Sequence, residues 1–143
     1  MESGVTVTRL ELDSPERFVP LRRRLGVTSF GLNQMMLRPG QRGRIHRHER
    51  QEEVYLVLRG TLTLELEGEE RDVGEGELAR VGPEVRRRLL NRGPADCVLI
   101  ALGAAGEHAG RDGLAWADWD DPEPRTPQEI PLPDDLPASE LRT

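Results

Sequence analysis

The sequence contains no lysine and only one cysteine. All 20 basic side chains of this 143-residue chain are arginine, which excludes Schiff-base chemistry or general-base chemistry by lysine. Cys97 has no partner for an internal disulfide, and its apolar surroundings predict a small buried side chain. The first residues show no basic start followed by an apolar stretch. These features together predict a cytoplasmic protein without a signal peptide.

Long apolar runs and clusters of basic charge are also missing. No apolar run approaches the roughly 18 residues that a membrane-spanning helix needs. The net charge of −6 comes from residues 118–143, which hold eight acidic and two basic side chains, while the preceding residues balance to zero. Because nucleic-acid binding needs a clustered basic face, we expect no nucleic-acid partner. A basic amphipathic helix for a membrane surface is lacking as well.

The chain divides into three predicted parts. Residues 1–26 form a lead-in, in which the alternation over Val5–Leu12 predicts a strand and Glu16–Leu25 a short helix that ends at Gly26. Residues 27–103 form the folded domain. Residues 104–143 are predicted to be a flexible, acidic, proline-rich tail, with six of the 11 prolines after residue 121. We expect Trp116 and Trp119 to attach this tail to the domain or to a second subunit.

The central part reads as a succession of short strands separated by glycine and proline. Thr61–Glu67 alternates apolar and polar side chains, as in a half-buried strand, whereas Val54–Leu58 is apolar throughout and predicts a strand covered on both faces. Strands at this spacing indicate an all-β antiparallel sandwich or barrel. The predicted strands are residues 28–37, 43–48, 53–59, 61–67, 70–73, 77–81, 85–91 and 96–102.

Two of the three histidines in the chain lie close together, at positions 46 and 48. On a strand this spacing places both imidazoles on one face. Glu53 opens the next predicted strand and would return beside the imidazoles if the two strands paired. Such a set binds divalent Fe, Mn, Ni, Cu or Zn and leaves coordination positions open. The alternative is a solvated pair of histidines in a charged loop.

The spacing of Gly40, His46, His48, Glu53 and Gly60 resembles the first motif of the cupin superfamily. A weaker resemblance to the second cupin motif follows, from Gly76 through Gly82-Pro83 to Arg87 and Asn91. The resemblance implies a double-stranded β-helix, or jelly-roll barrel, over about residues 27–103. It also implies that His46, His48 and Glu53 bind a divalent transition metal.

The second motif differs from the family pattern at the position of a further metal-binding histidine, which is Arg87 here. Arginine has no lone pair to give to a metal. Two outcomes are therefore open. In one, three ligands hold the metal and Arg87 binds an anionic group of a substrate. In the other, Arg87 forms a bidentate ion pair with Glu53, and no metal binds.

Further candidates depend on which side chains point into the barrel. Tyr55 shares the predicted face of Glu53, and Gln34 and Met36 are predicted to face inward from an earlier strand. His108 is predicted to be exposed in the tail. Two functions stay open. One is a metal-dependent enzyme such as a dioxygenase, isomerase or decarboxylase of a small organic acid. The other is a binding module, metal-free or with a structural metal, that senses or stores a small anionic or sugar-like molecule. The resemblance also implies a homodimer, formed by exchange of Val5–Leu12 or the tail.

Overall fold

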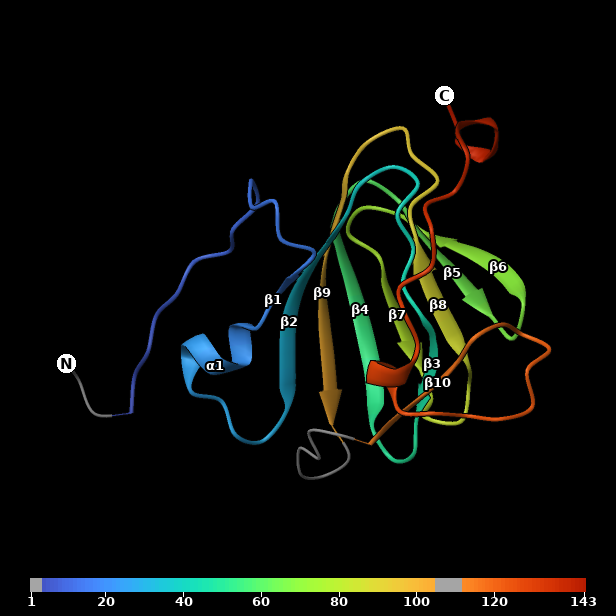
Figure 1. The fold of residues 1–143 in the computed structure, drawn as a ribbon. Coiled ribbons are helices and arrows are strands. Elements are labelled where there is room, and N and C mark those ends of the chain that lie inside the picture. The colour runs from blue at the N-terminus through green and yellow to red at the C-terminus, as the bar shows by residue number, and fades with distance from the viewer. Residues whose placement is uncertain (1–3, 105–111) are drawn as a thin grey trace.

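The structure is a computed structural model, and it describes residues 4–104 and 112–143. Its described residues form two five-stranded antiparallel sheets that pack face to face (Figure 1). The first sheet has the order β1-β2-β9-β4-β7, with β1 at Phe18–Val19, β2 at Gly31–Leu37, β9 at Cys97–Ala104, β4 at Glu52–Arg59 and β7 at Leu78–Val81. The second has the order β10-β3-β8-β5-β6, with β10 at Gly113–Trp116, β3 at Ile45–His48, β8 at Arg87–Leu90, β5 at Leu62–Leu66 and β6 at Glu69–Val73.

The main core lies between the two sheets and follows the alternation of the strands. Leu62 and Leu64 of β5 point inward against Tyr55 and Val57 of β4, and all four are at most 1% exposed. Because Leu62 and Leu64 alternate with polar neighbours, only one face of β5 is apolar. Cys97 is fully buried in this core, as predicted, and burial raises the pKa of its thiol to about 12.

A smaller apolar cluster covers part of the outer face of the first sheet. Val19 and Leu21 pack there with Ile100, and Leu56 and Leu58 of β4 lie against them. The apolar run Val54–Leu58 is therefore buried on its inner face and partly covered on its outer face. Helix α1 (Leu21–Leu25) supplies part of this cover and ends at Gly26, which adopts a left-handed conformation with φ of 75°. Among the described residues, no helix has the length and apolarity to cross a membrane.

The lead-in differs from the sequence-based prediction. Val5–Leu12 forms no strand, and the predicted helix is shorter, because Phe18–Val19 pairs with β2 instead. The alternation of Val5–Leu12 suits a strand, but the described residues offer it no partner strand. The segment is held at Glu11, where the Gln34 amide donates to the backbone carbonyl and accepts from the backbone amide, both at 2.7 Å. The Arg24 guanidinium also donates to the Glu11 carboxylate at 2.8 Å.

The carboxyl-terminal region is joined to the barrel more closely than the prediction of a separate tail implied. The boundary at residue 104 falls at the end of β9, and Gly113–Trp116 forms β10, which pairs with β3. Two short 3-10 turns follow, η1 at Pro127–Glu129 and η2 at Ala138–Glu140. The Arg86 guanidinium lies 5.3 Å from the ring centre of Trp116 and 5.6 Å from that of Trp119. These contacts are those expected of tryptophans that attach the tail to the barrel.

Candidate metal centre

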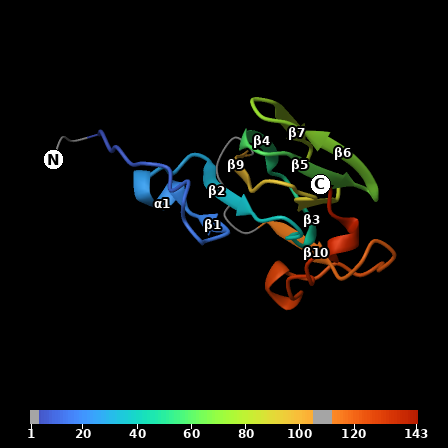
Figure 2. The same ribbon diagram turned by 90° about the horizontal axis from the view of Figure 1, so that it is seen from above.

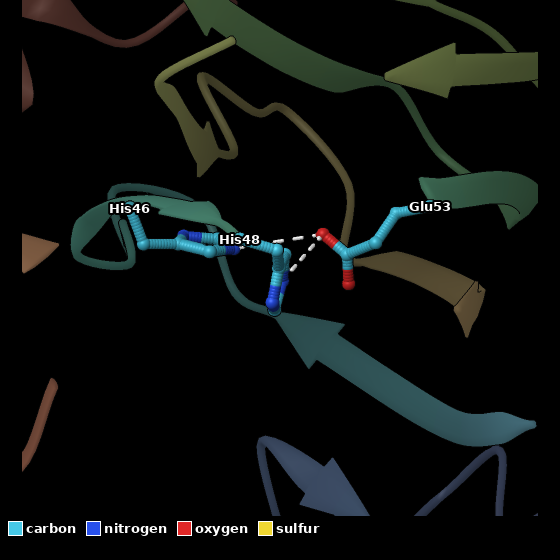
Figure 3. A group of neighbouring side chains, drawn as sticks. All are labelled: His46, His48 and Glu53. Atoms are coloured by element: carbon cyan, nitrogen blue, oxygen red, sulfur yellow. Dashed lines mark ion pairs between the residues drawn. The ribbon is translucent and has the colours of Figure 1, made fainter. Parts of the chain in front are cut away.

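His46, His48 and Glu53 meet inside the barrel, with one ligand atom from each within 4.8 Å of the others (Figure 3). The two histidines lie two residues apart on β3 and point to the same side, as their spacing predicted. Strands β3 and β4 do not pair, so the condition that the sequence left open for bringing Glu53 beside the imidazoles is not met. Strand β3 pairs with β8 and β10, whereas β4 belongs to the other sheet. Glu53 therefore reaches the imidazoles across the barrel interior, because the chain crosses between sheets after His48.

Each imidazole is oriented by an acceptor at its Nδ1 atom. The Nδ1 of His46 lies 3.2 Å from the carbonyl oxygen of Arg44, and the Nδ1 of His48 lies 2.9 Å from Oδ1 of Asp112. Both contacts favour the tautomer that carries its proton on Nδ1. The lone pair is then on Nε2, at 3.7 Å (His46) and 3.2 Å (His48) from Oε1 of Glu53. Both lone pairs are therefore available at the same point.

Asp112 is a site residue that the sequence analysis missed. Besides His48, its carboxylate accepts from the backbone N–H groups of Arg50 (3.0 Å) and Gln51 (2.8 Å) and from the Gln51 side chain (2.6 Å). Burial works to raise its pKa, but the hydrogen bonds from these N–H groups and from His48 outweigh burial and lower it. The carboxylate thus stays charged while it holds His48 and the connection between β3 and β4. Its distance of 64 residues from His48 leaves no sequence signal for this contact.

The Glu53 carboxylate is where the polar groups of the site converge. The Tyr55 hydroxyl donates to its Oε1 at 2.6 Å, which confirms that Tyr55 lies on the same face of β4. Burial works to raise the pKa of Glu53, but the two histidines, which hydrogen-bond to its carboxylate and carry positive charge when they are protonated, hold it well below its usual value. Burial likewise works to lower the pKa of His48, but Glu53 and Asp112 together raise it. Burial and the charge of Glu53 raise the pKa of Tyr55, so the hydroxyl keeps its proton.

Arg87 is fully buried beside this group and opposes His46 in the pairing of β8 with β3. Its Nη2 donates to the carbonyl oxygens of Val81 (3.3 Å) and Gly82 (3.2 Å). Its Nε lies 3.7 Å from Oε1 of Glu53, beyond hydrogen-bond distance. The bidentate pair with Glu53 that the sequence left open is therefore not formed. Nε and Nη1 of Arg87 find no hydrogen-bond partner among the described residues.

The prediction that Gln34 and Met36 face the barrel interior is wrong. Gln34 binds the backbone of Glu11 on the outer side of the first sheet. Met36 is two residues further along β2 and so shares that outer face, whereas Met35 packs against the main core. The predicted register is thus displaced by one residue, which exchanges the two faces of a strand. His108 lies outside the described residues.

The donor set fits a divalent transition metal. The Nε2 of His48 is buried and finds no hydrogen-bond partner among the described residues, and it points toward a carboxylate oxygen and a second imidazole nitrogen (Figure 3). Two imidazoles and one carboxylate suit Fe, Mn, Ni, Cu or Zn. The nearby carboxylate of Asp112 is the outer partner that metal-bound histidines commonly have. The residues present would therefore hold such an ion through His46, His48 and Glu53.

Comparisons with known proteins support the fold. Residues 33–103 match the family model of the cupin domain. No curated protein matches the chain. A cupin protein from Bacteroides fragilis superposes with a TM-score of 0.65 at 19% identity, over 76% of this chain and 92% of that one. A sugar phosphate isomerase of the cupin superfamily from Silicibacter pomeroyi gives 0.61 at 20% identity, over 85% and 88%.

A conserved protein with a double-stranded β-helix domain, from Klebsiella pneumoniae, also superposes on the chain. Its TM-score is 0.59 at 16% identity, over 73% of this chain and 89% of that one. At these identities the solved structures support the fold and not an activity. With two facing antiparallel sheets and a family model that matches residues 33–103, this chain belongs to the cupin superfamily.

Proposed function

We propose that this cupin binds a divalent transition metal through His46, His48 and Glu53 and uses it to hold a small anionic molecule in the barrel. The observation that carries the proposal is the orientation of the imidazoles. Both Nδ1 atoms have acceptors, so both Nε2 lone pairs converge on Oε1 of Glu53. Two neutral imidazoles and a charged carboxylate placed in this way form a ready ligand set for a metal.

The surrounding residues support an anionic ligand. When bound, the metal would supply Lewis acidity at the coordination positions that three protein ligands leave open. Arg87 would add a fixed positive charge next to those positions, since its Nη2 is held by two backbone carbonyls. Tyr55 would hold the Glu53 carboxylate in place through its hydroxyl. A small organic acid has the required charge, and the reaction classes that fit are those of a dioxygenase, isomerase or decarboxylase.

Metal analysis of the purified protein tests the proposal. The protein is incubated with Mn²⁺, Fe²⁺, Ni²⁺ or Zn²⁺, freed of unbound ion, and its metal content is compared with that of His46→Ala. We expect near-stoichiometric metal in the natural protein and its loss in the variant. Arg47→Ala is the matched control, because Arg47 lies between the two histidines on β3 but faces the ring of Trp116. A protein that retains none of the four metals would contradict the proposal.

A second candidate is a metal-free module that binds a small anion directly. It is favoured by the position of Arg87, whose positive charge lies 3.7 Å from a ligand oxygen and opposes a divalent cation. The same experiment separates the two candidates. Absence of metal, together with saturable binding of a carboxylate or phosphate that Arg87→Gln abolishes, would establish the metal-free module instead.

We also propose that two copies of the chain associate through the amino-terminal arm, residues 4–12. The side chains of Val5 and Val7 are 55% and 88% exposed, although the arm has the alternation of a strand. The arm extends away from the barrel (Figure 2). A groove of about 410 Å³ lies between the arm and the body, lined by Thr6, Val7, Thr8, Leu10, Leu21, Leu25, Leu32 and Ile100.

A second copy suits this surface because each chain presents the exposed valines of its arm next to the groove, so that the same patch of two copies can meet, as a two-fold interface requires. Light scattering coupled to size exclusion should give the mass of a dimer. Val7→Asp should give a monomer with an unchanged circular dichroism spectrum. Leu78→Asp, at an exposed position on β7, is the control. A natural protein that runs as a monomer at all concentrations would refute this association.

A further inference from the structure

We propose that the metal and a small monocarboxylate bind to this site cooperatively, and that Arg87 is the residue that couples them. This inference rests on the proposed metal site and adds the class of ligand and the way its binding is regulated. It follows from the fixed position of the positively charged Arg87 guanidinium. Arg87 is fully buried, opposes His46 in the sheet and is held at Nη2 by the carbonyls of Val81 and Gly82.

The charges of the site favour a single additional negative charge. Glu53 and Arg87 cancel, the two imidazoles are neutral when they bind metal, and Asp112 contributes one negative charge behind His48. A divalent ion therefore leaves the site with a net charge of one positive unit, beside a guanidinium shielded from solvent. In such a setting repulsion between like charges is weakly screened. A monocarboxylate restores neutrality, whereas a doubly charged anion would exceed it.

The N–H groups of Arg87 offer the carboxylate of the bound ligand a second point of attachment, besides the metal. Nε and Nη1 of Arg87 have no hydrogen-bond partner among the described residues, and Nε lies 3.7 Å from Oε1 of Glu53. A buried N–H group without a partner costs free energy, which an acceptor oxygen of the ligand would recover. Glu53 offers no such bond to Arg87, because its Oε1 accepts from Tyr55 and faces the imidazoles. The free N–H groups of Arg87 are thus left for a ligand.

Each ligand should then strengthen binding of the other by the same factor, since coupling between two ligands is reciprocal. The probe pair is Mn²⁺ and pyruvate, a monocarboxylate that binds Mn²⁺ only weakly in water. Free Mn²⁺ is measured from its electron paramagnetic resonance signal during titration of the protein, with and without pyruvate. We expect pyruvate to tighten Mn²⁺ binding by at least about fivefold, the lower end of usual coupling between sites. A titration of pyruvate into Mn²⁺ without protein corrects for the complex that forms in solution.

Three variants assign the effect to Arg87. In Arg87→Gln, which removes the charge, Mn²⁺ should bind more tightly than to the natural protein without pyruvate, and pyruvate should have little effect. Arg87→His, which puts an imidazole opposite His46, should show the same pattern with a larger gain. Arg80→Gln removes an exposed arginine that pairs with Glu52 and should leave the coupling unchanged. Full coupling retained in Arg87→Gln would overturn the role of Arg87.

The outcomes for the natural protein separate the two proposals. Mn²⁺ binding that pyruvate does not change overturns the cooperative inference and leaves the metal site standing. No Mn²⁺ binding under either condition overturns the metal site itself. Because these results come from the unmodified protein, they do not depend on whether the variants fold.

Discussion

Replacement of Asp112 by asparagine should change the tautomer of His48 and thereby weaken metal binding. In the natural protein, Oδ2 accepts from the backbone N–H groups of Arg50 and Gln51, and Oδ1 accepts from His48 and from the Gln51 side chain. An asparagine has only one acceptor oxygen. If that oxygen keeps the two backbone donors, its NH₂ group faces Nδ1 of His48. The imidazole then accepts at Nδ1 and carries its proton on Nε2, where the metal lone pair is needed.

The magnitude follows from the number of bonds involved. Loss of the outer partner of a metal-bound histidine costs about 10- to 100-fold in metal affinity, which is about 1.4 to 2.8 kcal/mol. At least one of the four bonds to Asp112 is lost in either orientation of the amide. Since a hydrogen bond to a charged group contributes about 1.5 to 3 kcal/mol, the free energy of unfolding should fall by at least about 1.5 kcal/mol.

Metal titration and nitrogen-15 NMR of the imidazoles check both consequences. The Asp112→Asn variant should bind Mn²⁺ or Zn²⁺ at least tenfold more weakly, and the His48 nitrogens should report protonation at Nε2. Asp72→Asn, which makes the same chemical change at an exposed aspartate of β6, is the control and should keep full affinity. The reasoning is refuted if Asp112→Asn retains natural affinity, or if His48 still carries its proton on Nδ1.

Three further outcomes are expected. Cys97, with a pKa of about 12, should react with a thiol reagent only after unfolding in urea, and fast reaction in native buffer would contradict its burial. Leu64→Ala should lower the free energy of unfolding in urea by about 2 to 5 kcal/mol, whereas the exposed Leu78→Ala should cost little. The hydrogen bond from Arg142 lowers the pKa of Asp72, so Asp72 stabilises the fold above its ordinary pKa, near 3.8, and loses this effect as the pH falls through the lowered value. Arg142→Ala should remove that part of the acid dependence, and identical acid titrations of the two proteins would exclude it.

The sequence predicted the common face of His46 and His48 well because strand alternation is a local property. His46 and His48 lie two residues apart, so any strand places them on one face, whichever strands pair with it. The same rule failed for Gln34 and Met36, since alternation fixes two faces of β2 but does not say which is inside. Both faces of β2 carry apolar side chains, so the pattern offers no polar face to identify the exposed side. A displacement of one residue was enough to exchange them.

The contact of Asp112 with His48 could not be predicted in this way. It depends on the pairing of β10 with β3, in which Gly113 opposes His48 across 65 positions of sequence. Four residues of strand within a glycine- and proline-rich region give a weak pattern, and the composition favoured a tail. The structure places this strand at the edge of the second sheet, next to the histidines. The predicted site therefore lacked Asp112 because its contact with His48 depends on the long-range pairing of a short strand.

Arg87 shows how an unfavourable arrangement of buried donors can indicate a ligand. The sequence identified the residue but left its partner open. In the structure Nε and Nη1 are buried without a hydrogen-bond partner among the described residues. Each such donor costs about 1 to 3 kcal/mol, and a glutamine or leucine at this position would avoid much of that cost. A carboxylate that satisfies both donors would recover this free energy on binding, in addition to its attraction to the metal. Pyruvate should therefore raise the melting temperature of the metal-loaded natural protein more than that of Arg87→Gln, and equal shifts in the two proteins would show that Arg87 does not contact the anion.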